Sequence, residues 1–301
     1  MGPTDITAKE ILEGLFESDQ RNISRIVAWD IRIPRIATAL VTGSSLGLAG
    51  VLIQLSTRSS FGDPNLFGVG GGAAIFLAAT AAGVFTFGEL GIFTGCVLSS
   101  LLVALILSTL ISNKNLSPVK LAIMGIAIGA LTVSIGTSVI SHGRVFPTQV
   151  IALLSGSFSG SNWEMVFYVV TTFLICFCIS WKMSNRFYPI MLGDTLARSL
   201  GVNPVRTRNV AMSITGILAG ASVYAGGLIG FVGLIAPHIT RRLFGNNPRD
   251  LILASSLIGA ILALGADQIA RLSFAPTELP VGMATTILGA PVMIYLASRM
   301  K

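Results

Sequence analysis

Long apolar stretches separated by short polar segments fill the chain between residues 36 and 298. A helix that crosses a bilayer needs about 20 predominantly apolar residues. The pattern therefore predicts an all-α, polytopic transmembrane helix bundle with about nine spans. Two short spans that meet at Gly226 and Gly227 are predicted as separate helices, not as one broken helix. The predicted spans cover residues 36–55, 66–87, 90–111, 119–140, 165–181, 209–225, 228–239, 251–269 and 281–298.

The segment before the first predicted span has a different pattern. Residues 1–35 combine several acidic residues with apolar residues at helical spacing, and they contain no apolar run long enough to cross a bilayer. The sequence thus predicts an external amphipathic N-terminal segment at residues 1–35, followed by a transmembrane domain at residues 36–301.

Composition and charge agree with a membrane protein. Hydrophobic residues make up 52% of the chain and charged residues 11%, and the mean hydropathy is +0.80, outside the range of soluble domains. The net charge of +7 is scattered over loops without a basic stripe, which excludes the usual nucleic-acid-binding pattern. Most lysines and arginines fall in alternate loops on the side that carries the C-terminus, so the positive-inside rule places the C-terminus in the cytoplasm.

The search for catalytic chemistry mostly yields exclusions. The chain has no phosphate-binding loop of the G-x-x-x-x-G-K-[ST] kind, so we expect no ATP hydrolysis by that route and no enzyme activity. The stretch Gly43-Ser44-Ser45-Leu46-Gly47 matches G-x-S-x-G, but it lies within an apolar helix, where small residues let helices pack closely. A hydrolase that pairs Ser45 with His238 would need residues from opposite ends of the membrane. Because neither His142 nor His238 has an acidic sequence neighbour, no metal site and no cofactor is expected.

One acidic residue lies inside a predicted span. Asp267 is followed one helical turn later by Arg271, and this spacing predicts a structural ion pair at the outer membrane edge. A direct role of Asp267 on a substrate path stays open. The alternative that the chain is an ion-gradient-driven secondary transporter also stays open, because such carriers place carboxylates within their spans.

A weak internal symmetry is also present. Arg35 precedes Thr42-Gly43 by the same number of residues as Arg208 precedes Thr215-Gly216, and a glycine-rich match follows each pair. The predicted topology starts the first unit outside and the second inside, so the repeat is predicted to be inverted, a common plan in transporters. The matching glycine-rich stretches are Phe67-Gly68-Val69-Gly70 and Gly230-Phe231-Val232-Gly233.

Five motifs resemble the permease subunits of ABC importers for iron-siderophores, haem and cobalamin, the FecCD-type family. They occur in the order found in that family and cover most of the chain. The motifs are Ile31-Arg32-Ile33-Pro34-Arg35, residues 192–202 (LGDTLARSLGV), residues 230–241 (GFVGLIAPHITR), Asp267 with Arg271, and Glu278-Leu279-Pro280-Val281-Gly282.

The resemblance implies a multi-pass protein of the bacterial inner (plasma) membrane that moves an iron-siderophore or related metal chelate into the cytoplasm by alternating access. Haem or cobalamin is the alternative cargo. The family pairs two permeases, identical or homologous, each normally with ten spans, and the first of these has no counterpart in this sequence. Two cytoplasmic ATPase subunits bind the ATP and Mg²⁺, and an extracytoplasmic substrate-binding protein delivers the chelate.

The resemblance also implies roles for particular residues. The loop 182–208 would couple the permease to the ATPases, and the second, fourth and last spans would line the translocation path. The family usually has Asn-Pro-Leu-Ala where this chain has Ser59-Ser60-Phe61-Gly62, so the constriction differs in detail. The coupling residues would be Leu192, Gly193, Asp194, Ala197, Arg198, Gly201 and Val202, with Ala197 as a small surface that enters a groove on the partner. The arginines that dock the binding protein would be Arg32, Arg35 and Arg271. The path and gate residues would be Ser59, Ser60, Phe61, Asp63, Pro64, Ser117 and Pro118.

Overall fold

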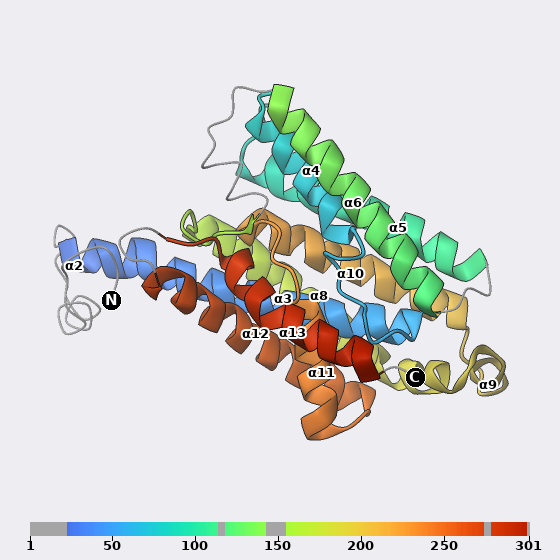
Figure 1. Cartoon of the computed structure of the whole chain (residues 1–301). Helices are drawn as coiled ribbons and strands as arrows, with labels where there is room; N and C mark the ends of the chain where they lie inside the picture. The colour runs from blue at the N-terminus through green and yellow to red at the C-terminus, as the bar shows by residue number, and fades with distance from the viewer. Residues whose placement is uncertain (1–22, 114–117, 143–154, 274–277, 300–301) are drawn as a thin grey trace.

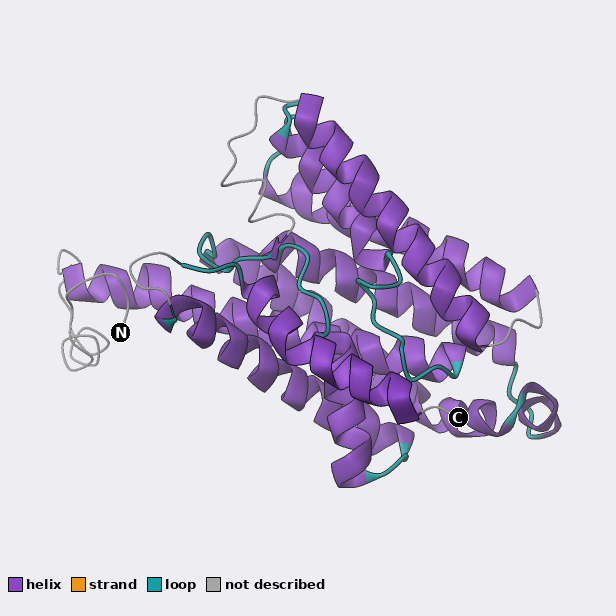
Figure 2. Cartoon of the chain, viewed as in Figure 1, coloured by secondary structure: helices purple, strands orange, loops and turns teal. Residues whose placement is uncertain are grey.

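The computed structural model describes residues 23–113, 118–142, 155–273 and 278–299. Regular structure in these residues is helical, joined by short loops (Figure 2). The short helices are α2 (Ile23–Ile26), the π-helical segment η1 (Val27–Arg32) and α9 (Asp194–Ser199). The others are α3 (Ile33–Thr57), α4 (Val69–Ala81), α5 (Glu89–Asn113), α6 (Pro118–His142), α8 (Trp163–Leu192), α10 (Pro204–Gly226), α11 (Val232–Phe244), α12 (Pro248–Leu272) and α13 (Val281–Arg299).

Each of the nine predicted spans corresponds to one of these helices, from α3 to α13 without α9. Among the described residues, 6 helices are long and apolar enough to cross a membrane, and the remaining apolar helices are shorter. The prediction of two separate helices around Gly226 and Gly227 is confirmed, because α10 ends at Gly226 and α11 begins at Val232.

The predicted boundary at residue 35 is not a break in the structure. Residues 1–22 lie outside the described part, but α2, η1 and α3 follow one another directly, and Val27–Thr57 forms one apolar helical stretch. Pro34 lies in the first turn of α3, where a missing N–H is tolerated. The wider π-helical turn before it lets the helix continue through the proline, since the N–H of Ile33 bonds to the Ala28 carbonyl.

Asparagine caps begin three of the long helices. The Asn162 side chain accepts a hydrogen bond from the Met165 N–H at the start of α8. Asn203 caps α10 and Asn247 caps α12, and each is followed by a proline in the first helical turn. A capping side chain satisfies an N–H group that has no partner within the helix, and proline there removes another. The polar loops therefore define these helix starts.

The central helices of the bundle are α3 and α10. Buried residues make up 72% and 78% of their apolar windows, against 22% for α5, 28% for α6 and 22% for α8. Helices α4, α5 and α6 pack together beside α10, whereas α11, α12 and α13 pack together beside α3 (Figure 1). The α3–α10 contact joins the two groups. The exposed surfaces of the outer helices are rich in large apolar side chains such as Leu98, Leu102 and Ile261, as expected for surfaces that face lipid.

Small residues allow the closest helix contacts. A Cβ atom added at Gly43 would lie 2.3 Å from the Gly259 carbonyl oxygen, and one added at Gly47 would lie 2.2 Å from the Ser255 carbonyl oxygen. Helices α3 and α12 thus touch backbone to backbone, which gives van der Waals contact without a hydrophobic driving force. The G-x-S-x-G match is therefore helix packing, as predicted, with Ser45 buried inside α3.

The two halves of the predicted repeat have similar local structure. In each half a long helix is followed by an irregular segment and a helix of 13 residues. The residue before each short helix has a left-handed backbone, with φ 74° at Gly68 and 68° at Phe231. This shared geometry supports the repeat, and its inversion stays a prediction.

Candidate functional site

The predicted site residues fall at three levels along the bundle. We call the end that carries the start of α3 and the end of α12 the outer end, and the end that carries α9 the inner end. The docking arginines belong to the outer end, and the coupling residues to the inner end. The constriction residues lie in the segment between α3 and α4. Of the predicted gate residues, Ser117 lies outside the described residues and Pro118 begins α6.

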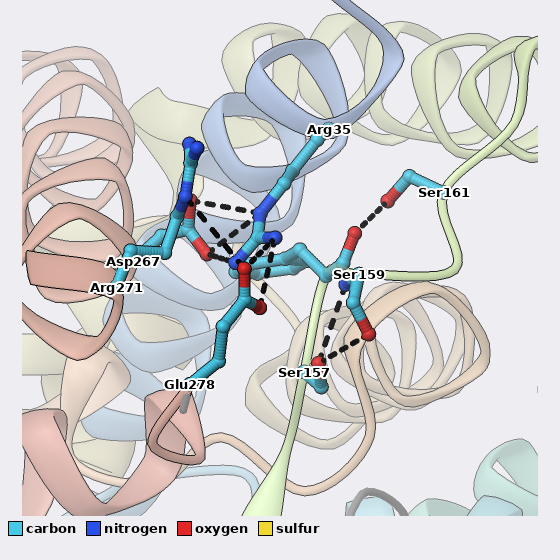
Figure 3. Close-up of polar contacts among 8 residues, drawn as sticks. Arg35, Ser157, Ser159, Ser161, Asp267, Arg271 and Glu278 are labelled. Atoms are coloured by element: carbon cyan, nitrogen blue, oxygen red, sulfur yellow. Dashed lines mark hydrogen bonds and ion pairs between the residues drawn. The ribbon is translucent and has the colours of Figure 1, made fainter. Parts of the chain in front are cut away.

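Arg35 is the centre of an ionic cluster at the outer end (Figure 3). Its Nε donates to both Asp267 carboxylate oxygens at 3.1 and 3.2 Å, and its Nη2 donates to Asp267 Oδ1 at 2.7 Å. Its Nη1 donates to both Glu278 oxygens at 3.0 Å. The contact with Asp267 uses two nitrogens, Nε and Nη2, and such a fork is the strongest arginine–carboxylate geometry, whereas Glu278 is held through Nη1 alone. Arg35 on α3 therefore holds the end of α12 and the segment before α13 together.

The predicted ion pair between Asp267 and Arg271 is wrong. Asp267 pairs with Arg35 across the helix interface, whereas Arg271 Nε lies 3.9 Å from Glu278 Oε1. The Asp267 side chain is completely buried, and a buried carboxylate needs a partner that can meet both oxygens. Arg35 meets that need from the neighbouring helix, so a pair within α12 is not formed.

The three docking arginines differ in access. Arg35 is 7% exposed, and both edges of its guanidinium are engaged by acids of the chain itself. Arg32 is partly exposed, whereas the Arg271 side chain is only 11% exposed, close to the 9% of the Arg35 side chain. The like charges of Arg32 and Arg271 lie near enough to interact. Docking through these arginines stays a prediction.

A buried polar network fixes the constriction between α3 and α4. Gln54 on α3 donates through Nε2 to the Gly62 carbonyl at 3.0 Å and to the Gly233 carbonyl at 3.4 Å. Its Oε1 accepts a hydrogen bond from Arg241 on α11. Asp63 Oδ1 accepts the N–H groups of Asn65 and Leu66, both at 2.9 Å. The constriction and both ends of α11 are therefore tied to one side chain of α3.

The predicted gate residues have different positions within this network. Ser59, Asp63 and Pro64 are buried, so they shape the loop, while Ser60 is exposed and Phe61 is partly exposed. A cavity of about 270 Å³ opens beside them towards the inner end. It is lined by Gln54, Leu55, Arg58, Ser59, Ser60, Met191, Arg241 and Asn246.

Sequence reasoning missed Gln54, Arg58 and Arg241 as members of the site. A single amide inside an otherwise apolar span was the available signal for Gln54, because an unpaired polar group there is costly. In the sequence, Arg58 and Arg241 indicate only how the chain is oriented in the membrane. Nothing local shows that Arg58 contacts α8 or that Arg241 contacts α3.

The predicted coupling segment forms a separate short helix at the inner end, where it contacts α8 and α10 (Figure 1). Gly193 with φ 124° and Gly201 with φ 76° bracket α9, as predicted. Arg208 donates to Asp194 at 2.7 and 2.9 Å. Arg58 also pairs with Asp194 and donates to the Ile190 carbonyl at 2.9 Å. Two arginines thus hold the first turn of α9 against the bundle.

The α9 helix presents one face outwards. Leu196, Arg198 and Leu200 are exposed, whereas Ala197 is 0% exposed and Val202 packs on the largest core cluster. The expectation that Ala197 enters a partner's groove is therefore wrong. Ala197 lies on the face of α9 that packs on the bundle, within the same core cluster.

The electrostatics of Asp194 follow from these contacts. Partial burial on its own would raise the pKa of this carboxyl group, but the hydrogen bonds and charges of Arg208 and Arg58 outweigh burial and lower the pKa below its ordinary value. Asp194 therefore remains ionised, and both of its ion pairs persist, well below neutral pH.

Comparisons with known proteins cover nearly the whole chain. The model of the FecCD transport family matches residues 1–299. The chain is 34% identical to the Fe(3+)-citrate import system permease protein YfmD of Bacillus subtilis over 303 residues, 99% of this chain and 89% of YfmD. It is 32% identical to the vitamin B12 import system permease protein BtuC of Vibrio cholerae over 282 residues, 92% of this chain and 84% of BtuC.

A solved structure has the same fold. It is described as an inward-facing conformation of a metal-chelate type ABC transporter, and it matches with a TM-score of 0.81 at 29% identity. The match covers 97% of this chain and 96% of that one. The helical arrangement thus belongs to a known transporter architecture.

Proposed function

The chain belongs to the FecCD transport family, and from this premise we propose that it is the permease subunit of an ABC importer that carries an iron(III) chelate into the cytoplasm. The chain lies in the plasma membrane with its C-terminus in the cytoplasm. It forms the translocation path together with a second permease, identical or homologous. The second, fourth and last spans, which are α4, α6 and α13, line that path.

The observation that carries the proposal is the geometry of α9. This helix lies at the inner end, is held by two arginines, and exposes Leu196, Arg198 and Leu200. An exposed apolar and basic face on an anchored short helix fits a groove on a partner protein. Two cytoplasmic ATPase subunits, which hold the ATP and Mg²⁺, are the partners that bind there. The absence of a phosphate-binding loop motif from the sequence supports this division of labour.

Arg58 provides the mechanical link in this mechanism. It ends α3, begins the constriction segment, and contacts both Asp194 on α9 and Ile190 at the end of α8. When ATP binding draws the ATPases together, α9 moves with them, and Arg58 transfers the displacement to Ser59 and the constriction. Alternating access then follows from a rigid-body shift of the two permeases.

The proposed cargo is an iron(III) chelate. The identity to a permease named for Fe(3+)-citrate import supports it, and the match to a metal-chelate type transporter agrees. Cobalamin is the second candidate, because the chain is also 32% identical to a vitamin B12 permease. An ion-gradient-driven carrier is disfavoured, because Asp267, the acidic residue on which that alternative depends, is neutralised by Arg35.

Transport into proteoliposomes tests the proposal. The chain would be purified with the ATPase and binding protein that copurify with it, and reconstituted without an ion gradient. We expect ATP-dependent accumulation of ⁵⁵Fe supplied as iron(III) citrate or iron(III) hydroxamate. ATP-dependent accumulation of labelled cobalamin alone would favour the second cargo. Uptake that ignores ATP and follows a proton or sodium gradient would contradict the importer function.

A further inference from the structure

Glu278 contacts the guanidinium groups of Arg35 and Arg271, which are expected to bind carboxylates of a partner protein. Its two oxygens accept Arg35 Nη1 at 3.0 Å each, and Oε1 lies 3.9 Å from Arg271 Nε (Figure 3). Asp267 already satisfies the other edge of Arg35. Glu278 is therefore a second carboxylate on an arginine that is already neutralised.

The two carboxylates on Arg35 differ in how firmly they are held. Asp267 is buried with its side chain 0% exposed, and its removal would strand a charge. The Glu278 side chain is 30% exposed, and Arg35 keeps its hydrogen bonds to Asp267 when Glu278 leaves. Arg271 Nε is buried and forms no hydrogen bond, although Glu278 lies nearby. A partner's carboxylate that takes the place of Glu278 would give Arg271 the hydrogen bond that Glu278 does not form.

We propose that Glu278 occupies the outer arginine site and is displaced when the extracytoplasmic binding protein docks, because an acidic side chain of that protein takes its place on Arg271 and Arg35. We call this role of Glu278 the guard. The proposal rests on the importer function proposed above. It assigns to Glu278 a role in regulating docking, in competition with the partner and not as a contact that the partner uses.

The position of Glu278 connects this exchange to the translocation path. The next residue, Leu279, donates its N–H to the Ala270 carbonyl at 3.0 Å, and Val281 at the start of α13 donates to the Gly156 carbonyl at 2.9 Å. The first turns of α13 line a cavity of about 280 Å³ through Gly282, Met283 and Thr286. Release of Glu278 therefore removes the ionic anchor just before the helix that borders this cavity.

Two measurements on the full complex test the guard, each with Glu278→Gln, the truncated variant Glu278→Ala and the control Glu164→Gln. Glu164 is an exposed outer-end acid that bonds Tyr168. The first measurement is phenylglyoxal labelling of Arg271, read by mass spectrometry without any binding protein. The second is the affinity of the copurifying binding protein for the complex in nanodiscs. We expect faster labelling of Arg271 and about three- to tenfold tighter docking in both Glu278 variants, with the control unchanged.

The outcomes separate this inference from the proposed function. Labelling that stays at the wild-type rate in both Glu278 variants would overturn the guard, whatever the docking result. Unchanged or weaker docking, with binding to the wild-type complex intact, would overturn it as well and make Glu278 a structural or docking residue. Failure of the wild-type complex to bind any binding protein would instead overturn the importer function on which the inference rests.

Discussion

The two ends of the bundle use the same ionic chemistry in opposite proportions. At the outer end one guanidinium, Arg35, holds two carboxylates, Asp267 and Glu278. At the inner end one carboxylate, Asp194, holds two guanidinium groups, Arg58 and Arg208. Burial differs as strongly, because the Asp267 side chain is 0% exposed and the Asp194 side chain is 39% exposed.

This difference gives the two clusters different roles. We call the buried Arg35–Asp267 pair the clamp, and the ion pairs of Asp194 with Arg58 and Arg208 the joint. Rearranging the Arg35–Asp267 pair would strand charges in a medium of low dielectric, so α3 and α12 stay fixed to each other at the outer end. The ion pairs of Asp194 are open to water and can break and re-form at little cost. The inner end can therefore move with a partner, while the outer end admits change only at the partly exposed Glu278.

The largest expected effect comes from breaking the clamp. Asp267→Ala leaves Arg35 charged, buried and only partly compensated by Glu278, and removal of one partner of a buried pair costs about 3–5 kcal/mol. We expect a clearly lower thermal unfolding midpoint of the purified permease in detergent. The control is Asp30→Ala, which removes an exposed acid near the same end. A midpoint equal to that of the wild type would show that the outer cluster is not a clamp.

An intermediate effect is expected from cutting the joint between α9 and the constriction. Arg58 has a left-handed backbone with φ 54°, so Arg58→Gly removes the side chain without backbone strain. We expect ATP-dependent uptake to fall about fivefold or more, the usual size of a lost coupling, while the ATPases still copurify.

Arg208→Gln is the matched control for this joint. It removes the other arginine on Asp194 and leaves the link from α9 to the constriction intact. Uptake by Arg58→Gly that equals uptake by Arg208→Gln would mean that Arg58 only anchors α9 and transmits nothing.

The smallest effect concerns pH. The folded chain lowers the pKa of Asp194, so the stabilisation is complete above the ordinary carboxyl pKa and is lost as the pH falls through the lowered value. Because the Asp194 side chain is 39% exposed and its charge is screened by solvent, the contribution is below about 1 kcal/mol. Asp194→Asn should lower the thermal midpoint slightly at neutral pH, and the gap to the wild type should narrow as the pH falls below the ordinary carboxyl pKa. A gap that is independent of pH would contradict the ionic account of the inner end.

Much of the fold could be predicted from the sequence. Apolar runs locate each long helix, because hydrophobic length acts within one segment. The α9 helix was also predictable, since Gly193 and Gly201 bracket it.

The partners of charged residues could not be predicted in the same way. Spacing within α12 suggested Asp267 with Arg271, but the partner Arg35 lies on α3, 232 residues earlier. Likewise the sequence of α9 does not show that Ala197 faces the bundle, because that orientation is set by Asp194 and its two arginines. Contacts between distant segments depend on how the helices pack, which local patterns do not encode.

The central claim is that this chain is driven by partner ATPases through the exposed face of α9, and copurification with an α9 variant tests it most directly. The variant would carry Leu196→Glu with Arg198→Glu, both exposed positions, and the control is Arg186→Glu, also exposed, on α8 at the same end. The account predicts loss of the ATPases and of ATP-dependent uptake in the α9 variant alone, with membrane insertion and thermal midpoint unchanged. ATPases that copurify normally with the α9 variant, with uptake intact, would contradict it.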